Sequence, residues 1–281
     1  MPWPFDREYM QLALVAGVIV GACAPLIGTF LVQKRMSLLG DGIGHLAFAG
    51  VAAGLLLEVW PVWTALVVAV VGALGVELLR SRGTASGDLA LAIFFYGGIA
   101  AAVVISSRAS SGSANVFPYL FGSILTVTRS DVVLVAVLGG VIVATMLVAG
   151  RAMFAVVLDE EAARVAGLPV RALNAVLAVL TAVTVVAAMR VVGVLLVAAL
   201  MVLPVATTRL VARSFVRTVA YAVVLGVLEV VAGLAAARAW ALAPGGSIVL
   251  TGVVCFAFAA ATAGVLRRGP GSLPLGGPLG H

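Results

Sequence analysis

Charged residues are scarce in this chain, and their scarcity excludes a water-soluble globular protein. Only 10% of the 281 residues are charged and 63% are hydrophobic, and the mean hydropathy is +1.25. A soluble domain carries about 25% charged residues. The apolar runs extend over about 20 residues, which favours a bundle of membrane-spanning helices over a barrel, whose strands alternate over about 10 residues.

Cysteine and lysine are also nearly absent, and this narrows the chemistry of the chain. Cys23 and Cys255 both lie in apolar runs, which favours small core residues over a disulfide or a metal motif. The only lysine, Lys34, lies in no glycine-rich loop, and the sequence contains no G-x-x-x-x-G-K-[ST] motif. Hydrolysis of ATP would therefore require another subunit.

The net charge of +6 does not indicate nucleic-acid binding. The arginines occur singly or in pairs between apolar runs, without a basic cluster that has interleaved aromatic residues. Such a distribution is typical of side chains that anchor spans at the inner membrane leaflet. We expect contacts with membrane lipid and none with nucleic acid.

The lengths of the apolar runs predict an all-α fold, a polytopic bundle of about nine transmembrane helices. The segment 192–208 contains Pro204, so an alternative is eight full spans plus a short or half-inserted helix. We expect one transmembrane domain over residues 1–268 and a Gly- and Pro-rich disordered tail over 269–281. The predicted spans are 9–33, 39–57, 60–79, 88–106, 130–149, 172–189, 192–208, 218–238 and 247–266.

The basic residues predict the orientation of the bundle, with the N-terminus outside and the C-terminus inside. Most of the basic residues then fall on the cytosolic side, and Arg108, Arg190 and Arg238 fall on the outer side. The residues that share the predicted cytosolic side follow the odd-numbered spans, and they are Lys34, Arg35, Arg80, Arg82, Arg151, Arg164, Arg171, Arg209, Arg213, Arg217, Arg267 and Arg268.

Asp41 and His45 are ionisable residues four positions apart inside the apolar run 39–57. Residues four apart on a helix share a face, so the carboxylate and the imidazole could reach one divalent cation. Placing either group in lipid is costly, which makes the pair a candidate functional site. The alternative is structural: Asp41 caps the start of a helix and His45 is satisfied by ordinary neighbours.

The polar segment between the fifth and sixth spans has the pattern of a short surface helix. Asp159 is a candidate N-cap, followed by Glu160 and Glu161, whose negative charges suit the first turn. Gly167 is a candidate for the position after the last turn, and Pro169 prevents continuation. A rigid helix there could bind a cytosolic partner; the alternative is a plain connector.

Glu229 lies in the middle of the eighth predicted span. It could line a transport path or relay protons, or it could be a structural carboxylate paired with an arginine near the outer mouth. Glu77 and Asp88 lie near the inner ends of their spans, where we expect them to cap helices or to pair with Arg80 and Arg82.

Three segments resemble the metal-ion (zinc/manganese) ABC importer permease family. The resemblance extends over nearly the whole chain, and the segments occur in the expected order. The first segment is similar to the family pattern R-M-S-L-L-G-D-x-x-x-H, the second to its coupling helix, and the third to V-G-x-L-L-V-x-A-L-L-x-x-P-A-A-T. In this chain they cover residues 35–45, 158–169 and 192–207.

The resemblance implies a permease subunit, not an enzyme, in the cytoplasmic membrane. It implies that the subunit imports a divalent transition metal by alternating access, with zinc as the first expectation and manganese or iron as alternatives. The ion would be a transported substrate rather than a permanently bound cofactor. The implied partners are a second copy of the permease, a cytosolic ABC ATPase dimer and an extracytoplasmic metal-binding lipoprotein.

The resemblance also assigns roles to individual residues. Asp41 and His45 would contact the passing ion, with water or the other subunit completing an open site that can release it. The coupling helix that docks on the ATPase would include Asp159, Glu160, Glu161, Arg164 and Gly167. Among these, we expect Glu160, Glu161 and Arg164 to be exposed contacts.

Other classes of protein remain as alternatives at this stage. A stand-alone metal channel or a secondary transporter would move metal without an ATPase, and the latter often has inverted repeats, which are not evident here. A siderophore- or cobalamin-type ABC permease would have a similar coupling segment. An intramembrane metalloenzyme would need further ligands, and the sequence has no H-E-x-x-H motif.

Overall fold

The computed structural model describes residues 4–83, 87–108 and 117–267, and within these ranges every regular element is helical. The all-α prediction is therefore confirmed. The predicted tail 269–281 lies outside the described residues. The helices are α1 (Glu8–Gln33), α2 (Leu39–Leu56), α3 (Pro61–Ser81), α4 (Gly87–Arg108), α5 (Phe117–Phe121), α6 (Arg129–Leu158), α7 (Glu160–Val165), α8 (Val170–Ala188), α9 (Val194–Arg209), α10 (Phe215–Trp240) and α11 (Pro244–Arg267).

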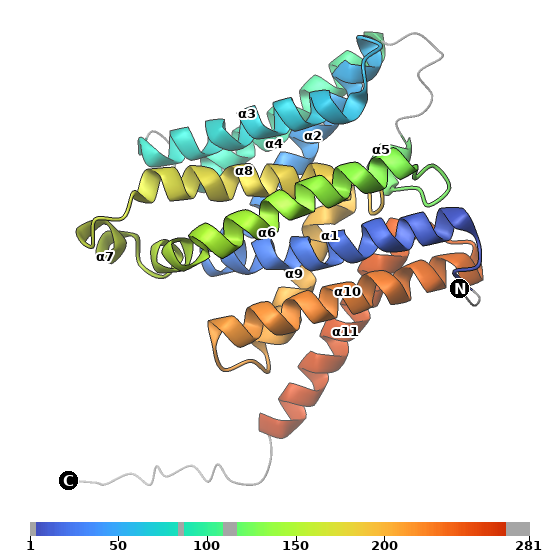
Figure 1. Cartoon of the computed structure of the whole chain (residues 1–281). Helices are drawn as coiled ribbons and strands as arrows, with labels where there is room; N and C mark the ends of the chain where they lie inside the picture. Colours follow the sequence, from blue (N-terminus) through green and yellow to red (C-terminus); the bar gives the residue numbers. More distant parts are fainter. Residues whose placement is uncertain (1–3, 84–86, 109–116, 268–281) are drawn as a thin grey trace, which may run out of the picture.

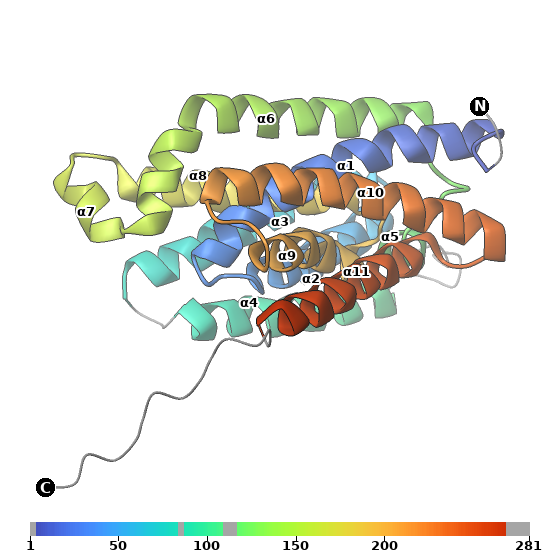
Figure 2. The same ribbon diagram turned by 90° about the horizontal axis from the view of Figure 1, so that it is seen from below.

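Eight of the described helices are long and apolar enough to cross a membrane, and α9 is a shorter apolar helix. With 16 residues, α9 extends over about 24 Å, less than the roughly 30 Å of a hydrocarbon core. It lies steeply across α1 and α10 in Figure 1 and is seen nearly end-on in Figure 2. The structure thus has the alternative form of the prediction, eight spans plus a short helix.

Most of the predicted spans agree with the helices to within a few residues, and the largest difference is at the end of α6. The prediction ended at residue 149, but α6 continues to Leu158. The apolar run ends before Arg151, so hydropathy alone places the end of the span there. The backbone, however, remains helical up to Asp159, which is the N-cap of the next helix. The five-residue α5 was not predicted, because it is too short to have a periodic pattern.

The centre of the bundle consists of α1, α2, α8 and α9: α8 and α9 contact each other, and each also contacts both α1 and α2. Glycines permit close approaches between helices, as two examples show. A Cβ atom on Gly28 of α1 would lie 1.8 Å from the carbonyl oxygen of Met201 in α9. A Cβ atom on Gly98 of α4 would lie 3.0 Å from the backbone of His45 in α2. Small residues therefore bring these backbones together, as is common between membrane helices.

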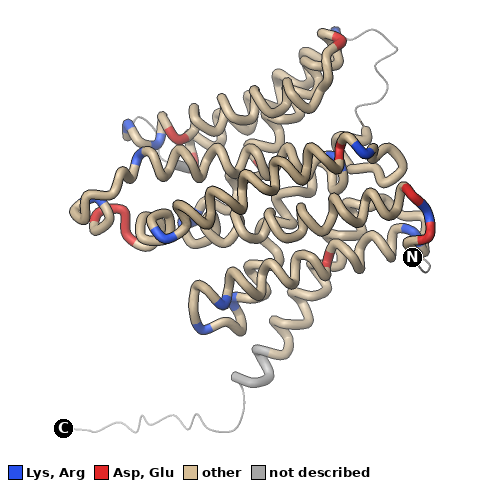
Figure 3. The backbone as a smooth tube through the Cα atoms, viewed as in Figure 1, with Lys and Arg blue, Asp and Glu red and all other residues tan. Residues whose placement is uncertain are grey.

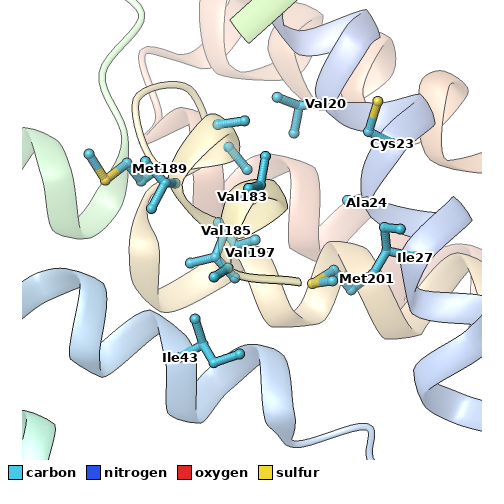
Figure 4. Close-up of a cluster of buried hydrophobic side chains, with 14 of the residues drawn as sticks. Val20, Cys23, Ala24, Ile27, Ile43, Val183, Val185, Met189, Val197 and Met201 are labelled. Atoms are coloured by element: carbon cyan, nitrogen blue, oxygen red, sulfur yellow. The ribbon is translucent and has the colours of Figure 1, made fainter. Parts of the chain in front are cut away.

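The core is a cluster of buried aliphatic side chains between these central helices (Figure 4). Cys23 of α1 is buried in this cluster and forms no disulfide. Met189 and Met201 are also fully buried in it, next to aliphatic neighbours such as Val185 and Ile27. These side chains contribute packing, as the sequence indicated for Cys23.

The two ends of the bundle differ in charge. Figure 3 shows more Lys and Arg residues at the end that carries α7, which we call the α7 end, than at the opposite end. The positive-inside rule predicts that the α7 end faces the cytosol. This orientation remains a prediction, since the structure contains no membrane.

Candidate functional site

Asp41 and His45 lie in the first two turns of α2, at the end of the bundle where the connection from α1 enters it. Leu38 occupies the N-cap position, and Asp41 lies inside the first turn without a capping hydrogen bond. The structural alternative, in which Asp41 caps the helix, therefore does not hold. Its carboxylate still gains from the positive end of the helix dipole. One turn further along, His45 lies on the same face.

Both side chains of this pair are half-buried. Within the described residues, neither makes a side-chain hydrogen bond or an ion pair, and the imidazole of His45 packs edge-on against Phe95 with 4.5 Å between ring centroids. A carboxylate and an imidazole without polar partners are available to a ligand. The part of the chain that the structure describes contains no group of three or more His, Cys, Asp or Glu side chains able to hold a metal. The pair is thus, by itself, an incomplete coordination site.

A pocket of about 310 Å³ lies between α2 and α4 beside this pair. Asp41 lines it together with Asp88, Phe95 and Tyr96. Asp88 does not pair with Arg80, contrary to one expectation, because Arg80 binds Glu77 and Glu160 instead. Its position in this pocket was missed, since the sequence does not indicate that α2 and α4 pack so closely.

The helix α7 has both of the predicted terminal signals. The carboxylate of Asp159 accepts hydrogen bonds from the backbone N–H groups of Glu161 and Ala162, at 2.9 and 3.0 Å. Gly167 adopts a left-handed conformation with φ of +81°. The N–H of Gly167 donates to the carbonyl of Arg164, and the N–H of Leu168 donates to the carbonyl of Ala163. These bonds form a Schellman motif, which ends the helix sharply.

The residues expected to be exposed on α7 divide into two groups. Glu161 and Arg164 are exposed. Glu160 is not a free surface residue, which corrects the prediction: its carboxylate binds Lys34 at 2.8 Å and Arg80 at 3.2 Å. The amide of Asn174 also donates to it, at 3.3 Å. These partners are distant in sequence, so only folding brings them together.

Burial and charge act together in this cluster, which we call the Glu160 cluster: Glu160, Lys34, Arg80, Glu77 and Asn174. Burial lowers the pKa of Lys34, because desolvation disfavours its charged form more than its partners favour it. Burial opposes ionisation of Glu160, but hydrogen bonds and attraction from Lys34 and Arg80 hold the pKa of its carboxyl below the ordinary value. The partners of Glu160 therefore outweigh its burial, whereas the partners of Lys34 do not.

Glu229 of α10 is buried, with 2% of its surface exposed. Its Oε1 atom has no hydrogen-bond partner among the described residues. Its other carboxylate oxygen faces Gly252 of α11. The expectation of an arginine partner is wrong, because the guanidinium groups of Arg190 and Arg238 contact Asp131 and Tyr9 instead.

A second buried ion pair lies at the opposite end of the bundle. The guanidinium of Arg190 binds both carboxylate oxygens of Asp131, at 2.9 and 3.1 Å. It also donates to the carbonyl of Thr126 and lies 5.0 Å from the centroid of the Tyr119 ring. Asp131 in turn forms a capping box with Thr128 at the start of α6. This pair ties the segment before α6 to the connection between α8 and α9.

With the fold and the candidate residues placed, comparison with known proteins gives the family. The model of the ABC 3 transport family matches residues 6–263. The chain belongs to the ABC 3 transport family. The resemblance read from the three sequence segments is confirmed by this match.

Curated relatives and solved structures agree with this family. The high-affinity zinc uptake system membrane protein ZnuB of Haemophilus influenzae is 27% identical over 251 residues, which cover 89% of this chain and 95% of that protein. The manganese transport system membrane protein MntC of Halalkalibacterium halodurans is 28% identical, covering 90% of this chain and 86% of that protein. A solved structure of PsaBC from Streptococcus pneumoniae in complex with Fab has a TM-score of 0.81 at 28% identity, covering 90% of this chain and 91% of that one.

A structure of an inward-facing putative metal-chelate type ABC transporter has a TM-score of 0.71 at 15% identity. This likeness concerns the fold alone. Family membership and the eight apolar helices identify the chain as a multi-pass protein of the cytoplasmic membrane, a permease of an ABC transporter. Neither a metalloenzyme nor a channel that acts alone is favoured by these findings.

Proposed function

We propose that this chain is the permease subunit of an ATP-driven importer of a divalent transition-metal ion. The observation that carries the proposal is the pair Asp41 and His45. The pair lies in an apolar helix long enough to cross a membrane, and neither side chain makes a hydrogen bond or an ion pair among the described residues. A passing cation would be held by one oxygen and one nitrogen ligand, and released because the site is open. The names of the relatives, which refer to zinc and to manganese, support the substrate class.

The proposed importer has further subunits. A cytosolic ATPase dimer would dock on α7, which is capped at both ends and presents Glu161, Arg164 and the 91% exposed Val165. A second copy of the permease would face this one across the metal path and complete the coordination. An extracytoplasmic lipoprotein would deliver the ion at the end opposite α7. No permanently bound cofactor is part of the proposal.

The identity of the ion is the most specific part of the proposal. Zinc is the first choice, because imidazole suits it well, while the carboxylate keeps manganese and iron compatible. Glu229 is a further candidate for the transport path, since one of its buried oxygens has no hydrogen-bond partner in the described part of the chain.

Metal uptake by cells tests this function. Cells that carry the complete transporter with wild-type permease, Asp41→Asn or His45→Gln are supplied with zinc, manganese or iron, and their metal content is measured by elemental analysis. We expect each variant to lower uptake by at least roughly tenfold, since even changes outside the ligand shell cost about that much in metal affinity. Glu58→Gln, an exposed carboxylate just beyond the far end of the same helix, is the matched control.

Two outcomes would contradict the proposal. The first is wild-type uptake by both Asp41→Asn and His45→Gln at equal amounts of inserted protein. The second is metal flux through the purified chain in liposomes without any ATPase, which would favour a channel or a secondary transporter.

A further inference from the structure

The Glu160 cluster joins the ends of four helices. Glu160 is the first residue of α7, Lys34 follows the last residue of α1, and Arg80 lies in the last turn of α3. Asn174 lies in the second turn of α8 and also accepts a hydrogen bond from Lys34. The short helix α7 is therefore fastened to α1, α3 and α8 through a single carboxylate.

The burial of the cluster makes this fastening firm. The side chain of Lys34 is only 7% exposed, and Asn174 and Glu77 are also buried. A buried ammonium needs anionic partners, and removing one of them leaves an uncompensated charge. Moving α7 away from the bundle would separate Glu160 from Lys34 and leave the buried ammonium without its partner. We therefore expect α7 and the end of α1 to move together.

The two faces of α7 contrast in their contacts. On the inner face, Ala163 is buried against Val156 and Val170, and Glu160 binds the cluster. On the outer face, Glu161 and Arg164 are exposed, and within the described residues they make no ion pair. Glu160 and Glu161 are adjacent and chemically identical, yet only the first is connected to another helix.

The connection from Lys34 to the metal pair is short. Residues 34–38 link α1 to α2, and Asp41 lies in the first turn of α2. The link is held tightly: Met36 donates to the carbonyl of Leu31, and Arg35 takes a left-handed conformation with φ of +60°. Because the link is short and its backbone is hydrogen-bonded, a displacement of Lys34 would also displace the first turn of α2.

We propose that Glu160 is a positioning residue that transmits the movement of α7 through Lys34 to the α1–α2 link and so to Asp41. It would act by holding the inner side of α7, while the exposed face of the helix contacts the ATPase. The inference deepens the proposed function and rests on it. It assigns the coupling step to a partly buried ion cluster rather than to contacts on the surface of α7.

The contact is tested first, without reference to transport. Because Lys34 is the only lysine, an amine-reactive reagent reports on this side chain apart from the amino terminus of the chain. In the detergent-solubilised full-length protein, Glu160→Gln should raise the labelling rate of Lys34 several-fold, whereas Glu161→Gln should leave it unchanged. Equal labelling of the wild type and Glu160→Gln would overturn the inference.

Coupling is then measured in the complete transporter in proteoliposomes, as zinc or manganese moved per ATP hydrolysed. We expect Glu160→Gln to lower this ratio by roughly tenfold, an ordinary coupling factor, while ATP hydrolysis continues. Glu58→Gln, which changes an exposed carboxylate outside α7 and the Glu160 cluster, should keep the ratio. Glu160→Asp retains the charge and should recover part of the ratio, and it replaces Glu160→Gln if that variant fails to insert.

The outcomes separate the two proposals. A Glu160→Gln variant with exposed Lys34 and a wild-type ratio would overturn the transmission role and leave the proposed function intact. An equal loss in Glu58→Gln would also overturn it, because an exposed carboxylate outside the cluster would then matter as much. If the wild-type complex neither hydrolyses ATP nor moves metal, the proposed function itself fails before any variants are compared.

Discussion

Charged side chains near the two ends of the bundle form ion pairs, whereas the carboxylate of Glu229, in the middle of α10, has an oxygen without a hydrogen-bond partner among the described residues. At the α7 end, Glu160 binds Lys34 and Arg80, and at the opposite end Arg190 binds Asp131 through two oxygens. Between them, Oε1 of Glu229 has no hydrogen-bond partner within the described residues. The partnered groups join separate helices, and Glu229 joins none.

The difference separates structural from functional charges. A buried ion pair stays charged because each group compensates the other, and it holds the elements that carry it. A buried polar atom without a partner lowers stability, and it is retained where something other than folding requires it. Asp41 and His45 are only half-buried, but they too make no side-chain hydrogen bond or ion pair in the described part of the chain, which leaves them open to a ligand.

The largest effect on stability is expected at the opposite end of the bundle. Asp131 is only 2% exposed, and Arg190→Ala would remove its cationic partner; removal of one partner of a buried pair costs about 3 kcal/mol. The measurement is thermal unfolding in detergent, followed by intrinsic fluorescence. Arg190→Lys keeps the charge but loses the two-pronged geometry, so it should be intermediate. An unfolding midpoint of Arg190→Ala equal to that of the wild type would contradict the view that the paired charges are structural.

A smaller effect of opposite sign is expected in the middle of the bundle. Glu229→Gln removes an acid that is costly to bury and keeps its shape, so stability should rise by about 1 kcal/mol or remain unchanged. The same unfolding assay measures this, together with metal uptake by cells. A loss of stability would mean that Glu229 has a partner after all. A fall in uptake at retained stability would assign Glu229 to the transport path.

The smallest effect is expected for an ion pair on the surface. Arg129 binds Glu8 at 2.7 Å, but the two side chains are 83% and 68% exposed. Such pairs contribute about 0.5 kcal/mol or less, so Arg129→Ala should unfold within a degree or two of the wild type. The matched comparison is Arg190→Ala, an arginine at the same end of the bundle. A large loss for Arg129→Ala would show that burial is not what distinguishes these pairs.

Much of the fold could be predicted because lipid imposes simple rules on length and hydropathy. A helix that crosses hydrocarbon must be apolar over about 20 residues, and this pattern is readable in α1, α3 and α10 without any tertiary information. The caps of α7 could also be predicted, because Asp159 and Gly167 act on the backbone within one turn. The end of α6 could not, since helix continuation past Arg151 depends on the segment that follows.

Less of the candidate site could be predicted. Asp41 and His45 were found from their spacing, and whether they contact a metal remains a prediction. The exposure expected for Glu160 was wrong, because its partners come from residues 34, 80 and 174. The sequence contains no local signal for such a cluster. A clue was available in retrospect: a single lysine at the end of an apolar helix, in a chain that otherwise uses arginine.

The sequence by itself determined that this protein is a membrane-spanning helical bundle with one ionisable pair inside an apolar helix, and that a short capped helix interrupts the spans. Those features depend on composition, periodicity and contacts within one helical turn. Only the tertiary structure decided which charges are compensated. Glu160 and Glu161 are adjacent and identical in type, yet one is half-buried and bound to two cations while the other is exposed. The reason is that compensation depends on neighbours that folding brings from other helices.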